Sequence, residues 1–338
     1  MYIAANLQQS FLSMEYRSVK GYTGWAQVGF LCVFLAVGIL LAGGIQFLIT
    51  MQIMPTGAKL TDSDAIMKAM LAPENVNFAR WSQVLSTFAL LFLPAIALSF
   101  ICNGKSMLWV GFSKHISAIQ LLLGFVIMFI TAIAVGPLAD ISKSIVAHFP
   151  TINASAKKLE DLYNTQALAL SNLKSLPEYI IGLFIMAFFP ALFEEVFFRG
   201  TLQNLFLRWL KKPILAILIT SILFSLVHSS IYLFLSRMAL GFALGLMYYY
   251  SKNIWINIVA HFINNTFALT ALYLMGNKLD KASIEKLDPH PHWLLALAAC
   301  GVLVLLFQLL QKRSGHNKAI IEEKELALVN NNHFKNNT

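Results

Sequence analysis

The stretch EYIIGLFIMAFFPALFEEVFF, residues 178–198, decides the fold of this chain. Its length is close to the roughly 20 residues that an α-helix needs to cross the hydrocarbon core of a bilayer. Glu194 and Glu195 stand near its end, and Arg199 follows directly after it, all among aromatic side chains. The stretch therefore predicts a transmembrane helix that carries ionisable groups.

The composition of the whole chain indicates the same class of protein. Of its 338 residues 58% are hydrophobic and only 12% are charged, whereas a soluble domain carries roughly 25% charged residues. We therefore exclude a soluble globular fold and predict an all-α, polytopic transmembrane helical bundle of about eight spans. The expected spans are 25–50, 81–102, 115–138, 178–198, 212–232, 234–250, 254–275 and 292–311.

Basic residues give the expected orientation. The net charge is +9, but the lysines and arginines lie mainly between apolar stretches and form no stripe with interleaved aromatics, which excludes nucleic acid as a partner. They gather on one side of the predicted bundle, as Arg17, Lys105, Lys211, Lys252 and Arg313 illustrate. By the positive-inside rule we expect a multi-pass protein of the plasma membrane with both termini cytoplasmic. The first residues lack the apolar core of a cleavable signal peptide.

Ionisable groups inside a span are informative because each costs about 2.5–3.5 kcal/mol at the bilayer centre. Glu195 and Arg199 stand four residues apart and share a helix face. Glu194 is rotated by about 100° from Glu195, so one carboxylate can pair with the arginine while the other faces the bundle interior. Pro190 should kink the helix just before the acids.

Two further spans carry polar residues at a spacing of four. Phe224 and His228 lie on the fifth span, and His261 and Asn265 lie on the seventh. If these helices pack with the first, a carboxylate and an imidazole can polarise a water molecule. A second imidazole and a carboxamide can donate hydrogen bonds to a developing oxyanion. These are the components of amide hydrolysis without a protein nucleophile.

The three patterns in this order resemble the motifs of the CAAX protease and bacteriocin-processing family of intramembrane endopeptidases. They are Glu-Glu-x-x-x-Arg from Glu194, Phe-x-x-x-His from Phe224 and His-x-x-x-Asn from His261. Each is weak alone, but together and in order they are specific. The resemblance covers about residues 178–275, and it implies that Glu195, Arg199 and Phe224 support the structure.

The resemblance also implies the catalytic roles. Glu194 and His228 would activate the attacking water, and His261 with Asn265 would stabilise the oxyanion. The same residues leave a metal mechanism open, because Glu194, His228 and His261 could supply three ligands to a divalent ion such as zinc, with one open position. The chain has no His-Glu-x-x-His motif and no Gly-x-Ser-x-Gly motif.

Simpler interpretations exist for each motif. The acids and the arginine could form a salt-bridge cluster at a helix end, and the histidines could be helix-packing residues. Their joint occurrence favours an endopeptidase that cuts a membrane-associated protein or peptide, with or without a lipid modification, at a pocket near the cytoplasmic face. The alternative is a non-proteolytic membrane scaffold or bacteriocin self-immunity protein of the same fold. A transporter would show repeated halves, and the sequence shows none.

These predictions divide the chain into segments. Between the spans, segments 51–80 and 139–176 contain amphipathic stretches, such as Ile141–Phe149 and Leu159–Leu170, which we expect at the membrane interface. The expected segments are a cytoplasmic N-terminal segment at 1–24, accessory helices with amphipathic connections at 25–176, the catalytic core at 177–275, a last span at 276–312 and a polar cytoplasmic tail at 313–338.

Overall fold

The computed structural model describes residues 16–55, 59, 61–276 and 291–335, with side chains described up to residue 330. These residues form α-helices joined by short connections, and no β-strand occurs among them. The predicted all-α polytopic membrane fold is thus confirmed. Six of the described helices are long and apolar enough to cross a membrane. They are α2 (Gly24–Ile53), α4 to α5 (Val76–Cys102), α6 (Ala118–Ala147), α8 to α10 (Leu176–Leu210), α13 (Ile254–Met275) and α15 (Trp293–Lys335).

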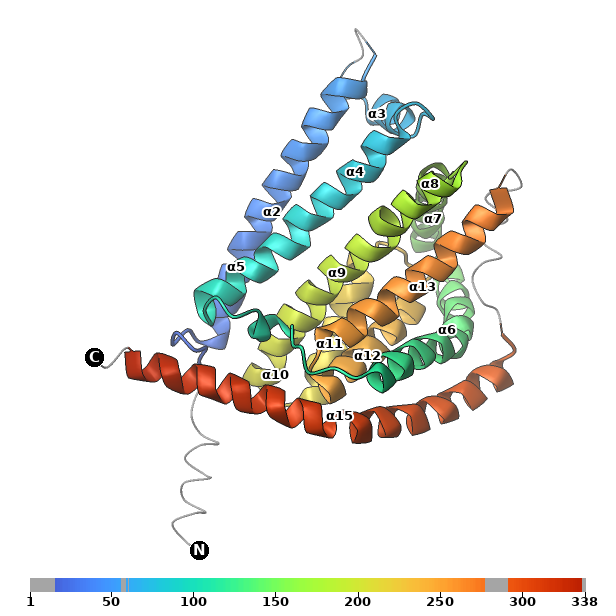
Figure 1. The fold of residues 1–338 in the computed structure, drawn as a ribbon. Helices are drawn as coiled ribbons and strands as arrows, with labels where there is room; N and C mark the ends of the chain where they lie inside the picture. The colour runs from blue at the N-terminus through green and yellow to red at the C-terminus, as the bar shows by residue number, and fades with distance from the viewer. Residues whose placement is uncertain (1–15, 56–58, 60, 277–290, 336–338) are drawn as a thin grey trace, which may run out of the picture.

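The remaining two predicted spans are shorter helices at the centre of the bundle (Figure 1). α11 (Pro213–Val227) is apolar but only 15 residues long, and α12 (Phe234–Ser251) packs against it. Lys211 and Lys252 adopt left-handed backbone conformations, with φ of 54° and 53°, directly after α10 and α12. A left-handed residue ends a helix, so both turns reverse the chain sharply.

Prolines widen two of the long helices into π-helical turns. η1 (Phe88–Phe92) precedes Pro94, and η3 (Leu183–Phe188) precedes Pro190. A proline has no N–H, and its ring clashes with the carbonyl four residues earlier; a π turn relieves both problems. The disturbance predicted at Pro190 takes this form. The α-helical parts are α4 (Val76–Thr87), α5 (Leu93–Cys102), α8 (Leu176–Gly182), α9 (Phe189–Glu195) and α10 (Asn204–Leu210), with η4 (Val196–Gln203) as a third π segment.

The connections between spans differ in part from expectation. The stretch Ile141–Phe149 is not a separate interfacial helix, because its residues continue α6 as far as Ala147. Pro150 then begins a new helix, α7 (Pro150–Ser171), which contains the second predicted amphipathic stretch. Two short helices, α3 (Ser63–Met70) and η2 (Met107–Val110), complete the described connections.

The last helix is longer than predicted. α15 runs through residue 312, where we placed the start of a polar tail, and crosses the end of the bundle where α10 and α12 end (Figure 1). Glu325 accepts bonds there from Arg208 at 3.2 Å and from Lys252 at 2.6 Å. Gln120 donates to the Ser314 hydroxyl at 2.9 Å. These partners fold the polar segment onto the bundle. The cytoplasmic placement of this end stays a prediction.

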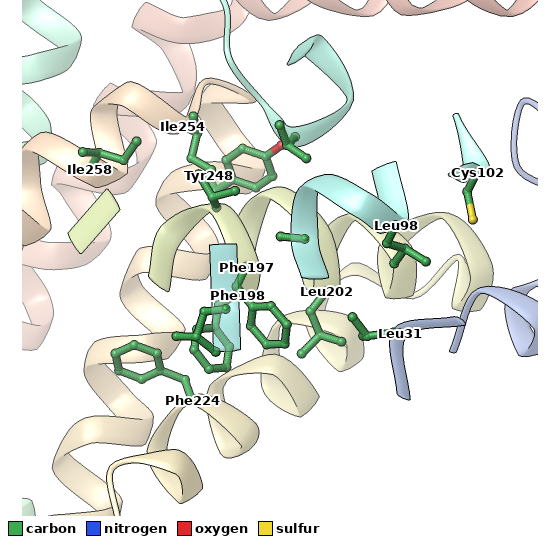
Figure 2. Close-up of a cluster of buried hydrophobic side chains, with 14 residues drawn as sticks. Leu31, Leu98, Cys102, Phe197, Phe198, Leu202, Phe224, Tyr248, Ile254 and Ile258 are labelled. Carbon is green, nitrogen blue, oxygen red and sulfur yellow. The ribbon is translucent and has the colours of Figure 1, made fainter. Parts of the chain in front are cut away.

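An aromatic cluster fills the interior beside the polar residues of α9 and η4. The Phe198 ring meets Phe224 edge to face at 5.2 Å, and Phe197 meets Phe198 in the same way at 5.0 Å. Figure 2 shows these three rings gathered with Leu202. On the other side of the cluster, the Tyr248 hydroxyl accepts a bond from Asn204 at 2.7 Å. The buried charges of Glu195 and Arg199 thus lie beside large apolar side chains.

Close packing of α2 on η1 generates a test of the fold. A methyl group at Gly38 would lie 2.7 Å from the carbonyl oxygen of Ala89, which is backbone and cannot swing aside. We expect Gly38→Ala to destabilise the protein by about 1–3 kcal/mol and to lower its Tm in detergent. Gly43→Ala on the same helix is the matched control, since nothing lies within 4 Å of its added methyl. Equal Tm values for the two variants would contradict this packing.

Candidate active site

Three helices bring the predicted side chains together. α9 carries Glu194 and Glu195, and Arg199 follows on η4. Phe224 lies in the last turn of α11, and His228 caps the C-terminal end of that helix. His261 lies midway along α13. His228 is at the end of α11 opposite to Lys211 and Lys212, and the placement of the pocket near the cytoplasmic face stays a prediction.

The carboxylate of Glu195 is the most highly coordinated group of the site. It accepts bonds from Arg199 Nη1 at 2.9 Å, from His261 Nδ1 at 2.9 Å and from Asn257 Nδ2 at 3.2 Å. The side chains of Glu195 and Arg199 are both 0% exposed. A buried ion is tolerated only with such partners. The spacing of Glu195 and Arg199 thus produces the ion pair that the sequence predicted.

Asn257 was missed by the sequence analysis, although a signal was present. It lies one turn before His261 on α13 and is completely buried. Its amide nitrogen also donates to the carbonyl of Leu244 at 2.7 Å, which links α13 to α12. A second polar residue at the same helical spacing, inside an apolar span, indicates a shared partner.

Arg199 extends the network to the two central helices. Its Nη2 donates to the carbonyl of Gly241 on α12 at 3.0 Å. Its guanidinium carbon lies 4.6 Å from the centre of the Phe224 ring of α11, within the range of a cation–π contact. Phe224 therefore contacts the charged network directly and also packs in the aromatic cluster.

Hydrogen bonds define how both histidines are oriented. His261 Nδ1 faces the Glu195 carboxylate, and His228 Nδ1 lies 2.7 Å from the carbonyl of Phe224. Carboxylate and carbonyl oxygens only accept, so Nδ1 carries the proton in each ring. Both Nε2 atoms are then directed at the Glu194 carboxylate, with Oε2 at 3.8 Å from His228 and 3.9 Å from His261.

Exposure separates the two glutamates. The Glu194 side chain is 16% exposed and that of His228 is 28% exposed, whereas Glu195 is fully enclosed. Glu194 Oε2 is itself buried and has no hydrogen-bond partner among the described residues. The open part of the site is thus formed by Glu194 and His228, and the Glu195 network lies behind it.

Asn265 is placed next to the site but is not bonded to it. Its amide nitrogen reaches the carbonyl of Ala187 on η3 at a long 3.5 Å. The Asn265 carboxamide lies one helical turn from His261, since both residues are on α13. The neighbouring Asn264 faces a different space, the large cavity described next.

A cavity of about 720 Å³ lies between α6, α7, α12 and α13. Phe125, Phe129 and Phe267 line its apolar part, and charged residues of α7 line another part. It adjoins the site through Arg237, which lines the cavity and donates to the carbonyl of His228 at 3.1 Å. An amphipathic space of this size is suited to an amphipathic ligand.

Among the residues that the structure describes, no group of three or more His, Cys, Asp or Glu side chains is arranged to hold a metal ion. Glu194, His228 and His261 thus stay the possible metal ligands that the sequence analysis named.

The buried ion pair makes a stability prediction. We expect Glu195→Gln to destabilise the protein by about 3–5 kcal/mol, because Arg199 would remain as an uncompensated buried charge. The double variant Glu195→Gln, Arg199→Met should be less destabilised than the sum of its single variants. Thermal unfolding in detergent measures both effects, with the exposed Glu323→Gln as control. Additive effects would show that the two charges are not coupled.

Comparison with known proteins agrees with this geometry. Residues 176–267 match the family model described as type II CAAX prenyl endopeptidase Rce1-like. The match starts at the beginning of α8, ends within α13 and includes all three motifs. No curated protein and no solved structure matches the chain. Over residues 176–267, about a quarter of the chain, the protein is therefore similar to the type II CAAX prenyl endopeptidases, as the three motifs predicted.

Proposed function

We propose that the protein is an intramembrane endopeptidase in which Glu194 and His228 activate the water that attacks a peptide bond. The observation that carries the proposal is the position of Glu194 Oε2, buried without a partner and facing the Nε2 atoms of two histidines at 3.8 and 3.9 Å. Both distances exceed a direct hydrogen bond, and both are short enough for one water molecule to bridge the groups.

Proton transfer follows from the protonation states of the two groups. A water between Glu194 and His228 can donate one hydrogen to the carboxylate and the other to the unprotonated Nε2. Its lone pair is then free to attack the carbonyl carbon of the substrate, and Glu194 takes up the proton. The same proton can pass to the departing amine nitrogen when the C–N bond breaks, which regenerates the carboxylate.

Stabilisation of the oxyanion requires a donor, and we assign it to His261 with Asn265. With Nδ1 bonded to Glu195, His261 can donate from Nε2 only as an imidazolium. The Asn265 amide would exchange its 3.5 Å contact with Ala187 for a bond to the oxyanion.

The donor chemistry of the same site also fits a divalent metal such as zinc. His228 and His261 both direct Nε2 toward the Glu194 carboxylate, and with both nitrogens unprotonated these three groups would form the usual donor set for that ion. Zinc bound by these three residues would lower the pKa of a bound water to about 7. We favour the metal-free mechanism, because water activation is already provided by the Glu194 and His228 pair.

We further propose that the substrate is a membrane-associated protein or peptide whose lipid chain or apolar segment enters the adjoining cavity. The 720 Å³ space has an aromatic part lined by α6 and α13 and a charged part at α7. This matches an amphipathic substrate with its peptide end near His228.

Replacement of the water-activating pair provides the central test. We expect Glu194→Gln and His228→Ala each to reduce cleavage by about 10²-fold or more while the proteins remain folded. Mass spectrometry of new N-termini compares membranes that contain the native protein, either variant or the control Glu178→Gln. Glu178 lies at the exposed start of the same helix. Identical N-termini in all membranes, with an unchanged host phenotype, would support the non-proteolytic alternative instead.

Metal removal separates the two mechanisms. We expect the purified protein to keep its activity after exhaustive dialysis against a chelator. Loss of activity that is restored by zinc, with zinc bound by the native protein but not by His261→Ala, would assign Glu194, His228 and His261 as ligands.

A further inference from the structure

Helix α7 lies outside the residues matched by the family model and contacts the loop that carries His228. This loop, residues 228–233, joins α11 to α12. Its second residue, Ser229, has a φ of +53°. A residue with a side chain in the left-handed region costs of order 1–3 kcal/mol and persists only where surrounding contacts impose it. The conformation next to His228 therefore depends on what holds the loop.

Hydrogen bonds from two side chains of the loop connect it to α7. The Ser230 hydroxyl donates to Glu160 Oε2 at 2.9 Å, and it also accepts from the backbone nitrogen of Leu233 at 3.3 Å. The Tyr232 hydroxyl donates to Asn153 Oδ1 at 2.6 Å. Ser230 is only 5% exposed, so water cannot readily replace the oxygen of Glu160 as its partner. The turn of the loop is thereby fixed against α7.

Arg237 adds a third connection between α7 and His228. Its Nη1 donates to the carbonyl of His228, and its guanidinium carbon lies 5.2 Å from the centre of the Tyr163 ring on α7. The backbone of His228 is thus bonded to Arg237 of α12, and Arg237 in turn contacts Tyr163 of α7.

The far end of α7 is anchored in a different part of the bundle. Arg80 of α4 donates from Nε to the carbonyl of Leu170 at 2.9 Å and from Nη2 to that of Asn172 at 3.3 Å. A buried cation at the C-terminal end of a helix satisfies its last carbonyls and interacts favourably with the helix dipole. α7 is therefore a fixed support for the loop.

We propose that Glu160 and Asn153 are positioning residues for the hydrolysis reaction, acting through Ser230 and Tyr232 to hold His228 against Glu194. The proposal rests on the proposed function for its catalytic consequence. It assigns this role to an accessory helix that also forms a wall of the cavity, beside the site that the substrate would occupy.

The first arm of the test measures the position of His228 without any substrate. Diethyl pyrocarbonate modifies unprotonated, accessible imidazoles, and mass spectrometry gives the rate at each histidine. We expect Ser230→Ala and Glu160→Ala each to raise the rate at His228 several-fold, and the double variant to raise it no further. Glu160→Gln should restore the native rate, since its carboxamide oxygen can still accept from Ser230.

Controls exclude a general loosening of the fold. The exposed His148 and the buried His261 should react at native rates in every variant, and the Tm should stay within a few degrees. Ser155→Ala is the matched control on α7, because its exposed hydroxyl bonds to the Thr151 carbonyl of the same helix and to no other group among the described residues. Native reactivity of His228 in both Ser230→Ala and Glu160→Ala would overturn the proposal.

The second arm measures cleavage with a peptide taken from a cut site found in the membrane N-termini. Ser230 does not line the cavity, so Ser230→Ala should lower kcat by about tenfold or more and leave KM within twofold. A rise in KM with unchanged kcat would show that α7 acts only in binding and would overturn the proposal. If the native protein cuts nothing, the proposed function fails, and the reactivity of His228 still decides whether α7 positions it.

Discussion

The Glu195 carboxylate is fully buried, and its charge has to be balanced inside an apolar bundle. Leaving such an ion unpaired would cost several kcal/mol, so its partners must be in place when the helices assemble. Arg199 comes from the same long helix, and Asn257 and His261 come from α13. Through Arg199 the network also reaches α12 and α11. One carboxylate therefore determines how the four helices of the core meet.

The chemistry of the site follows from that network. Because Glu195 binds Nδ1 of His261, the opposite nitrogen of the ring is directed at Glu194, which has no partner of its own. The carbonyl of Phe224 orients His228 in the same manner. Two adjacent acids on one helix are thus placed in different surroundings, because one is enclosed by donors and the other faces two ring nitrogens.

Two helices outside residues 176–267, α15 and α7, pack at the two ends of the core. At one end, the polar half of α15 lies on the turns that follow α10 and α12, and Glu325 binds Arg208 and Lys252. At the other end, α7 contacts the loop after α11 and forms a wall of the cavity. The core is therefore supported by helices that have no motif of their own.

The sequence by itself determined the all-α membrane fold, since apolar runs of crossing length permit little else, and the pairing of Glu195 with Arg199, since four residues form one helical turn. Only the tertiary structure decided the partners that lie far apart in the chain. It added Asn257 to the network, turned both histidines toward Glu194, left Asn265 on the carbonyl of Ala187 and extended α6 and α15 beyond their predicted ends. Periodicity specifies which face of a helix is polar, whereas the identity of the neighbour across that face depends on how all the helices pack.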